Sequence, residues 1–497
     1  MTFVVVLPVA LPLVTATVTL AARKDERVVR ASATAGAVGL LGAAVALLVL
    51  VAREGIQATQ VGDWRAPFGI SFVADTLAAV MVLVAAILAL AGVLYSQAFV
   101  DDRRVKGGYF PLLNVMLAGV CGAFLTGDLF NLYVWFEVLL VASFALLAMG
   151  GRRAELEGAV KYAVLSVIGS GFFLAGVGVL YGMSGTLNMA DLHERVSAMP
   201  EPRMATPAAA LLLVAFGLKA AVFPLFSWLP ASYPAAPPPV GALFAGLLTK
   251  VGVYAMMRMF TLVFVHDRAF THEILLWVSV VTMLVGVLGA VAQVEMLRLL
   301  SFHIISQIGY MTLGIALSGV AGLAGALFYV IHNIFAKSNL FLVSGIVHRA
   351  RTTFDLKALG GLARQDPLLA AAFLVPALSL AGVPPLSGFF AKVLVVRAAF
   401  AQGRPVAGAV ALLVGLLTLF SMNKIWQLAF WGHVPDDAQR RARTWRRPRG
   451  LYAPVLGLAS VTLLIGLAPG LLYALTEQAA HELTDPAEYV AAVMGAR

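Results

Sequence analysis

Six of the nine lysines of this 497-residue chain fall within long apolar segments, where a charged side chain is costly. All 26 arginines, in contrast, lie in loops or near the ends of such segments. A desolvated ammonium group can release its proton, whereas a guanidinium group cannot. The lysines within the apolar segments therefore indicate proton transfer. They are Lys161, Lys219, Lys250, Lys337, Lys392 and Lys424.

The depth of these lysines separates them into two groups. Lys161 and Lys424 lie near segment ends, where a long side chain can extend to water while its stem stays in lipid. The other four are too deep to do so. These are Lys219, Lys250, Lys337 and Lys392.

Glu137 is the one deep acid. It lies nine residues into an apolar segment that starts at residue 128, or about 14 Å along a helix that rises 1.5 Å per residue. This depth predicts a position near the middle of a bilayer, where a lone carboxylate is costly and requires a cation. We expect Lys219 to be that cation. A static structural ion pair is the alternative.

Two histidines complete the set. His303 lies in a polar stretch, Ser301-Phe-His-Ile-Ile-Ser306-Gln307. His332 and Lys337 point about 140° apart on an ideal helix, so a connection between them requires water or a π-bulge. For either histidine, a packed core side chain is the alternative. Together the acid, the four lysines and the two histidines predict a line of titratable groups that can carry protons with water.

The composition identifies the environment of these residues. Hydrophobic residues make up 61% of the chain and charged residues 12%, with a mean hydropathy of +0.92. Soluble globular proteins carry about 25% charged residues, and disordered chains are poor in apolar residues. Both classes are excluded, which leaves an all-α polytopic membrane protein. With roughly 20 residues per span, we place fourteen transmembrane helices. Their ranges are 2–22, 31–51, 70–95, 109–126, 128–149, 159–182, 205–230, 237–262, 273–293, 298–318, 321–346, 368–399, 406–432 and 451–475.

The loop charges predict the orientation. The odd-numbered loops hold twenty of the 35 Lys and Arg residues, and the even-numbered loops and the tail hold nine. Basic loops face the cytoplasm, so both termini are expected outside, with the basic run at 440–449 in the cytoplasm. The chain has no phosphate-binding loop, CxxC set or HExxH motif. We therefore expect no cofactor and no metal site, and energy from an ion gradient or a partner. The single Cys121 is expected to be a packing residue.

An internal repeat relates two groups of five helices. At an offset of 167 residues, Gly119-Val120 matches Gly286-Val287, and Asp128 matches Glu295. The repeat pairs spans 4–8 with spans 9–13, and an odd number of spans inverts the second copy. Spans 7 and 12 contain Pro224 and the pair Pro384-Pro385, which predict broken helices. Inverted repeats with paired broken helices are typical of ion and solute translocators, although a packing kink is the alternative for either break.

This organisation divides the chain into four parts. An N-terminal three-helix segment occupies residues 1–108, and the two repeats occupy 109–272 and 273–432. Residues 433–497 comprise the basic cytoplasmic loop, span 14 and an outward tail.

Several motifs resemble the proton-translocating subunits shared by respiratory complex I and Mrp-type Na⁺/H⁺ antiporters. The resemblance covers about spans 3 to 13. The motif around span 10 and Lys392 are most similar to the D-type branch of the Mrp antiporter subunits. The motifs are Lys219-Ala-Ala-Val-Phe-Pro-Leu-Phe-Ser-Trp-Leu-Pro230, Ala236-Pro-Pro-Pro-Val-Gly-Ala-Leu243 with Lys250, Leu300-Ser-Phe-His-Ile-Ile-Ser-Gln-Ile-Gly-Tyr310, His332-Asn-Ile-Phe-Ala-Lys337 and Gly382-Val-Pro-Pro-Leu-Ser-Gly-Phe-Phe-Ala-Lys392.

The resemblance implies a role for each site residue. Glu137 and Lys219 look like the paired residues of spans 5 and 7, and Lys250 looks like the central lysine of span 8. His332 and Lys337 look like the span 11 connection, and Lys392 looks like the residue at the exit. It also implies a hetero-oligomer that includes a larger homologous subunit.

Our leading hypothesis is therefore a proton-conducting subunit of a multi-subunit Na⁺/H⁺ antiporter in a bacterial plasma membrane, and not an enzyme. The main alternative is the same module in a redox-driven complex, such as complex I or a membrane-bound hydrogenase. A haem-binding electron carrier that uses His303 and His332 would leave the buried lysines unexplained. A scaffold without a transport role is the remaining alternative. No nucleic-acid partner is expected, because the positive charge follows membrane topology.

Overall fold

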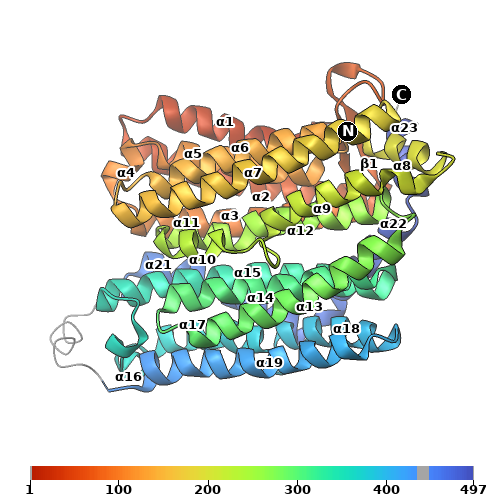
Figure 1. Ribbon diagram of the computed structural model, residues 1–497. Helices are drawn as coiled ribbons and strands as arrows, with labels where there is room; N and C mark the ends of the chain where they lie inside the picture. Colours follow the sequence, from red (N-terminus) through yellow and green to blue (C-terminus); the bar gives the residue numbers. More distant parts are fainter. Residues whose placement is uncertain (1–2, 434–446, 496–497) are drawn as a thin grey trace.

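Helices that run side by side make up most of the protein in the computed structural model, which describes residues 3–433 and 447–495 (Figure 1). Within these residues, twelve helices are long and apolar enough to cross a membrane, and two shorter apolar helices run beside them. The protein is a polytopic helical membrane protein. Of the basic run predicted at 440–449, residues 440–446 lie outside the described residues.

The N-terminal half contains helices α1 to α12. The long helices are α1 (Phe3–Ala21), α2 (Glu26–Glu54), α3 (Thr76–Phe99), α5 (Tyr109–Leu125), α6 (Leu129–Ala148), α7 (Arg153–Ser184), α9 (Thr206–Ala220) and α12 (Thr249–Leu262). The short elements are α4 (Asp102–Lys106), α8 (Met189–Ser197), α10 (Trp228–Ser232), α11 (Pro238–Leu243), the π-helix η4 (Phe244–Leu248), and the 3₁₀ turns η1 (Val61–Asp63), η2 (Pro202–Ala205) and η3 (Tyr233–Ala235).

The C-terminal half contains the remaining helices. The long ones are α13 (Arg268–Ala292), α14 (Met296–Leu317), α15 (Gly319–Arg351), α17 (Pro367–Ala381), α18 (Ser387–Ala401), α19 (Pro405–Ile425), α21 (Arg449–Leu467) and α22 (Pro469–Thr484). The short ones are η5 (Leu356–Ala358), α16 (Leu362–Gln365), the π-helix η6 (Trp426–Trp431) and α23 (Ala487–Met494).

The helices that carry the deep polar residues form the centre of the bundle. The apolar window of α11–α12 is 100% buried, that of α14 94% and that of α15 83%, against 33% for α2. The peripheral helices expose apolar side chains outward, as a lipid-facing surface requires. Lys250, His303, His332 and Lys337 thus lie on the most enclosed helices.

Two helices are interrupted where prolines fall inside apolar segments. Helix α9 ends at Ala220, and Ala221 adopts a left-handed conformation with φ 64° before Pro224. Helix α17 ends at Ala381, and Gly382 is left-handed with φ 91° before Pro384 and Pro385. Proline cannot donate a backbone hydrogen bond and excludes the carbonyl four residues earlier, so each helix stops and a second helix follows.

Two isolated β-bridges have matching positions in the two halves. One joins Asp128 to Asn188, and the other joins Glu295 to Asp355. Each bridge links the residue before a long helix (α6 or α14) to the segment that follows the next helix (α7 or α15).

Two elements differ from the predicted spans. An antiparallel hairpin, β1 (Gln57–Gln60) and β2 (Ser71–Ala74), precedes α3, so this helix begins at Thr76 instead of near residue 70. The Asp75 carboxylate caps α3 by accepting a hydrogen bond from the Ala78 N–H at 2.9 Å. The last predicted span, 451–475, is divided at Ala468 because Pro469 disfavours a helical conformation in the residue before it.

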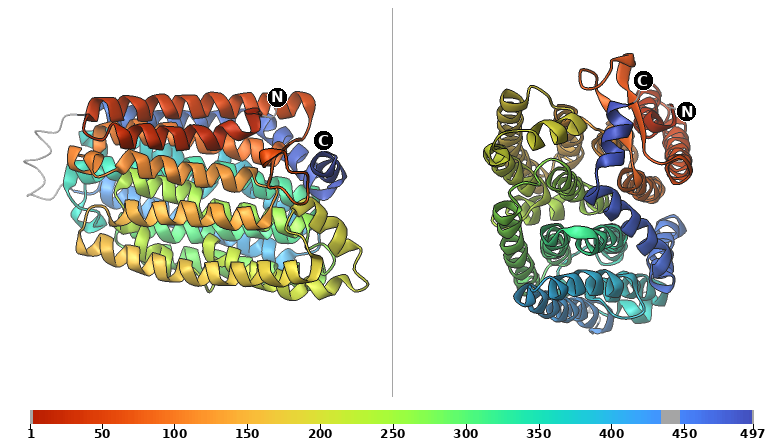
Figure 2. Two further views of the ribbon diagram at one scale, coloured as in Figure 1. Left: turned by 90° about the horizontal axis from the view of Figure 1, so that it is seen from above. Right: turned by 90° about the vertical axis from the view of Figure 1, so that its right-hand side faces the viewer.

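Both termini lie at the same end of the bundle (Figures 1 and 2). The hairpin and α8 share that end, whereas α4 and α16 lie at the other. Viewed end-on in Figure 2, the C-terminal helices α22 and α23 lie across this end and reach toward the N-terminal helices.

Candidate functional site

Glu137, Ser170 and Lys219 form a three-residue cluster contributed by α6, α7 and α9. The Ser170 hydroxyl donates a short hydrogen bond to Glu137 Oε1. Lys219 Nζ donates to Ser170 Oγ and to the Ser166 carbonyl, both at 3.2 Å. Among the described contacts, Glu137 and Lys219 form no direct ion pair. The predicted acid–base partners are therefore brought together through a hydroxyl group that the sequence analysis did not identify.

Lys219 is buried beside the break between α9 and α10. Its side chain is 5% exposed, and its Nζ lies 5.9 Å from the centroid of the Phe136 ring. A ring face attracts a cation, and the Phe136 ring forms the aromatic side of the cluster. Glu137 is half-buried on α6.

Lys250 is the second residue after the π-helix η4 and is fully buried. Its Nζ donates to the Ala245 carbonyl at 2.6 Å. A π-turn shifts the backbone pairing and leaves carbonyl oxygens available to a side chain. The sequence predicts water or a π-bulge between His332 and Lys337, but α15 is a regular helix and the π-turn precedes Lys250 instead.

Lys337 connects α15 to α14 and is also fully buried. It donates to the Leu300 carbonyl at 3.2 Å, and the next residue, Ser338, donates to the Ala242 carbonyl of α11 at 2.9 Å. On α14, His303 Nε2 bonds to the Ser421 hydroxyl of α19 at 2.5 Å.

His332 and Lys392 meet at the second helix break. His332 Nδ1 bonds to the Ser387 hydroxyl at 2.8 Å, and Ser387 lies 3.0 Å from the Ser379 hydroxyl. These serines stand on the two sides of the break, on α18 and α17. Lys392 Nζ donates to the Ala381 carbonyl at 2.7 Å and lies 5.6 Å from the Tyr310 ring centroid.

Several buried polar atoms along this line have no hydrogen-bond partner in the protein described. They include His303 Nδ1, His332 Nε2 and the side-chain amides of Asn333 and Asn339. Buried groups of this kind normally bind water. These atoms therefore lack a protein partner beside the predicted titratable side chains.

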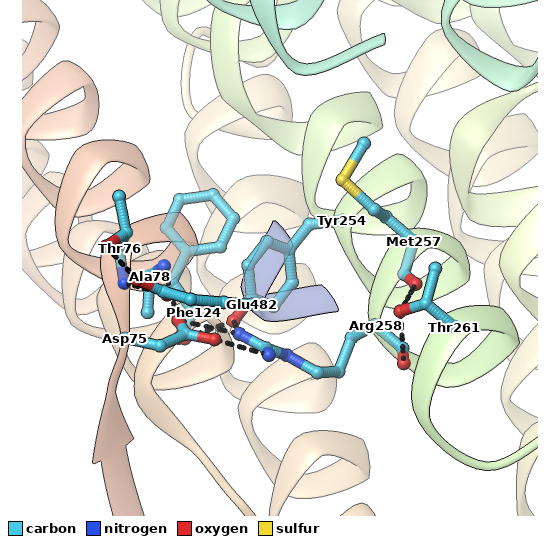
Figure 3. A network of polar contacts seen from close by, with 9 residues as sticks. All are labelled: Asp75, Thr76, Ala78, Phe124, Tyr254, Met257, Arg258, Thr261 and Glu482. Atoms are coloured by element: carbon cyan, nitrogen blue, oxygen red, sulfur yellow. Dashed lines mark hydrogen bonds and ion pairs between the residues drawn. The ribbon is translucent and has the colours of Figure 1, made fainter. Parts of the chain in front are cut away.

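A separate network closes the end of the bundle that holds both termini (Figure 3). Arg258 of α12 binds Asp75 through two hydrogen bonds of 2.5 and 2.9 Å, and both side chains are buried. Glu482 of α22 accepts hydrogen bonds from the backbone and hydroxyl groups of Thr76 at 2.9 and 2.5 Å. Burial, with a smaller contribution from the Asp75 charge, raises the pKa of Glu482 above its ordinary value.

All seven predicted site residues therefore lie within the bundle. They form separate groups and not one continuous line of directly bonded side chains. Glu137 and Lys219 form one cluster, Lys250 and Lys337 each bond a separate backbone carbonyl in the enclosed centre, and His332 and Lys392 lie at the second break. His303 contacts α19. Four serines that bond to these side chains were not predicted from the sequence: Ser170, Ser379, Ser387 and Ser421.

The described residues contain no group of three or more His, Cys, Asp or Glu side chains placed to hold a metal ion. Both histidines of the site bind serine hydroxyls, His303 through Nε2 and His332 through Nδ1.

Comparison with known proteins identifies a family and a relative that matches along almost the full length of the chain. Residues 126–421 match the family "NADH:quinone oxidoreductase/Mrp antiporter, TM". The chain is 42% identical to the D subunit of the Na(+)/H(+) antiporter of Alkalihalophilus pseudofirmus, with 99% of each chain covered.

Two solved structures share the fold. One is a chain in the structure of the Mrp complex from Dietzia sp. DQ12-45-1b, which matches with a TM-score of 0.92 and 36% identity, covering 100% of both chains. The other is a chain of the membrane-bound sulfane sulfur reductase, an archaeal respiratory membrane complex, with a TM-score of 0.90, 25% identity, and coverage of 99% and 100%. By the family match across 126–421 and the identity along its full length, this chain belongs to the NADH:quinone oxidoreductase/Mrp antiporter transmembrane family.

Proposed function

We propose that this chain is the proton-translocating D subunit of a multi-subunit Na⁺/H⁺ antiporter. The observation that carries the proposal is the buried series of Glu, Lys and His side chains through the centre of the bundle, in a chain that matches the D subunit of an antiporter over 99% of both lengths. The chain moves protons and catalyses no covalent chemistry.

The proton path starts at the cluster of Glu137 and Lys219. Their interaction sets the proton affinity of Lys250. In a low dielectric, a change in the charge of the Glu137–Lys219 cluster changes the free energy of the Lys250 ammonium group. Protons then pass from Lys250 through Lys337 and His332 to Lys392 at the second break. His303 lies beside this path.

The chain is built of fourteen transmembrane helices with inverted repeats over spans 4–8 and 9–13. The bridges Asp128–Asn188 and Glu295–Asp355 support this assignment, because each residue of the second bridge lies 167 residues after its counterpart in the first, which is the repeat offset. The left-handed residues Ala221 and Gly382 that end α9 and α17 support it as well. The parts 1–108, 109–272, 273–432 and 433–497 follow from these repeats.

The protein resides in a bacterial plasma membrane with both termini outside. The basic residues of α4 and of the α6–α7 turn, at the end of the bundle opposite the termini, support this orientation. Its partners are the other antiporter subunits, including a larger homologous one. The similarity to a chain of the Mrp complex from Dietzia supports such a hetero-oligomer.

The proposal is tested by replacing the two members of the first cluster. Glu137→Ala and Lys219→Ala are expected to lower Na⁺/H⁺ antiport in inverted vesicles by about tenfold or more, because a group that transfers protons contributes at least this factor. The other subunits should still co-purify. Matched controls are Glu157→Ala and Lys161→Ala, since these two residues form an exposed ion pair on α7. Full antiport in both cluster variants would refute the proposed role.

The second candidate is a proton-pumping subunit of a redox-driven complex such as complex I or a membrane-bound hydrogenase. The match to a chain of the sulfane sulfur reductase complex favours it. Gentle purification followed by mass spectrometry and assays for iron and flavin separates the two. Small hydrophobic subunits and a larger homologue without redox centres are expected for the antiporter. Iron–sulfur or flavin subunits would establish the redox complex.

A further inference from the structure

The first cluster contains a hydroxyl group with more partners than it has protons. Ser170 Oγ lies within hydrogen-bond distance of Glu137 Oε1, of the Ser166 carbonyl at 3.0 Å and of Lys219 Nζ at 3.2 Å. A serine hydroxyl donates one hydrogen bond and accepts up to two. It can therefore donate to Glu137 or to the Ser166 carbonyl at one time, but not to both.

We propose that Ser170 is the relay residue through which a proton passes between Lys219 and Glu137. This inference rests on the proposed function and specifies how its first step works. The carboxylate and the ammonium group do not need to meet, because the hydroxyl group already contacts both.

The transfer balances without any other reactant. Lys219 in its ammonium form donates to Ser170 Oγ, and the Ser170 hydroxyl donates to Glu137 Oε1. When the Lys219 N–H bond breaks, its proton forms a new O–H bond on Ser170. The original Ser170 proton moves at the same time to Glu137 Oε1. The products are a neutral lysine, an intact serine and a protonated carboxyl group, and the reverse transfer restores the charged pair.

The Ser166 carbonyl is a second acceptor for the Ser170 hydroxyl, used when no proton is being transferred. It accepts hydrogen bonds from both Ser170 and Lys219. When Glu137 is already protonated, the Ser170 hydroxyl can rotate to donate to this carbonyl and leave its lone pairs toward Glu137 and Lys219. The direction in which the hydroxyl donates therefore follows the protonation state of the cluster.

The packing of α7 holds this arrangement in place. Ser166 and Ser170 lie one turn apart on the same helix face, and Ser170 is buried. Between them, a Cβ atom added at Gly169 would lie 3.2 Å from Leu218 Cδ2, in the residue before Lys219. A larger residue at this position would press on Leu218, the neighbour of Lys219.

Three substitutions at Ser170 test the relay in the assembled complex. Ser170→Ala removes the hydroxyl, Ser170→Cys keeps a side chain of similar size with a weak donor, and Ser170→Thr keeps the hydroxyl. We expect antiport in inverted vesicles to fall about tenfold for Ala and Cys, the factor associated with losing one hydrogen bond to a charged group. Ser170→Thr should retain antiport within about twofold, since threonine also bonds the carbonyl four residues earlier in a helix.

Ser184→Ala is the matched control, because Ser184 is a buried serine of α7 that bonds the carbonyl four residues earlier, as Ser170 does, but lies outside the cluster. It should leave antiport unchanged. Antiport is compared only among variants that co-purify with the other subunits at the wild-type ratio. If Ser170→Ala does not assemble, Ser170→Cys decides the test, because the same loss of antiport is expected for it.

The remaining outcomes overturn the relay. Full antiport in Ser170→Ala, antiport retained by Cys but lost in Ala, or equal losses in all three variants would each assign Ser170 to packing. Glu137→Ala measured in parallel separates the two proposals. If it is inactive while Ser170→Ala is fully active, only the relay fails. If Glu137→Ala is active, the proposed function fails.

Discussion

At the scale of single residues, the four deep lysines share one bonding pattern. Each donates to a neutral backbone carbonyl, whereas the exposed Lys106 and Lys161 pair with the carboxylates of Glu26 and Glu157. A carbonyl satisfies an ammonium proton without adding a negative charge that would hold it permanently. This pattern is compatible with lysines that gain and lose protons. The lysine and carbonyl pairs are Lys219 with Ser166, Lys250 with Ala245, Lys337 with Leu300 and Lys392 with Ala381.

A prediction at this scale concerns the choice of lysine over arginine. Lys250→Arg keeps the positive charge but removes a releasable proton, so antiport should fall about tenfold or more while the complex assembles. Lys161→Arg is the control, because Lys161 is exposed and ion-paired on α7. Vesicle antiport assays at equal subunit content provide the measurement. Wild-type antiport by Lys250→Arg would show that only the charge at this position matters.

At the scale of elements, the two broken helices end in the same way with different residues. Ala221 and Gly382 both have positive φ values, 64° and 91°. A left-handed conformation costs an L-residue about 1–2 kcal/mol but costs glycine little. The first break therefore carries a backbone strain that the second does not. The second break is crowded instead, since a Cβ atom at Gly382 would lie 2.8 Å from Lys392 Cδ.

This difference predicts opposite effects of exchanging the two residue types. Ala221→Gly should stabilise the folded protein by about 1 kcal/mol, whereas Gly382→Ala should destabilise it by about 1–2 kcal/mol. Gly382→Ala should also displace Lys392 and lower antiport. Thermal unfolding of the purified complex in detergent, with antiport in parallel, checks both. Equal shifts of the unfolding midpoint in the same direction would contradict the argument.

At the scale of the whole molecule, one buried network joins distant parts of the chain (Figure 3). Asp75 follows the N-terminal hairpin, Arg258 belongs to α12, and Glu482 lies on the C-terminal helix α22. The Tyr489 ring of α23 covers the Arg258 guanidinium at 5.1 Å. The C-terminal helices are thus attached to the helix that carries Lys250.

Removing one partner of a buried ion pair destabilises a protein, because the other charge stays buried without a partner. Arg258→Met leaves the Asp75 carboxylate unpaired and should destabilise the protein by about 3–5 kcal/mol. Adding Asp75→Asn removes the unpaired charge and keeps the helix cap, so the double variant should recover most of the loss. Thermal unfolding and limited proteolysis of the C-terminal helices measure the effect. A double variant as unstable as Arg258→Met alone would contradict this account.

Much of the architecture follows from local properties of the sequence. Hydropathy along the chain predicts a membrane protein and its approximate spans, because the preference of a side chain for lipid comes from its own chemistry and not from its neighbours in space. The breaks near Pro224 and Pro384 were also predictable, since proline acts on its own helix. The hairpin before α3 was missed because β2 (Ser71–Ala74) is apolar and continues directly into an apolar helix.

The partners within the site could not be found in this way. Lys219 and Glu137 were identified by type and depth, because burying a charge is costly wherever the chain places it. Ser170 is 33 residues from Glu137 and 49 from Lys219, and a serine within a span is common enough to carry no signal by itself. Its role depends on how α6, α7 and α9 pack, and on the close approach at Gly169. The sequence by itself therefore identifies the titratable residues, whereas the hydrogen bonds that connect them form only when the helices are assembled.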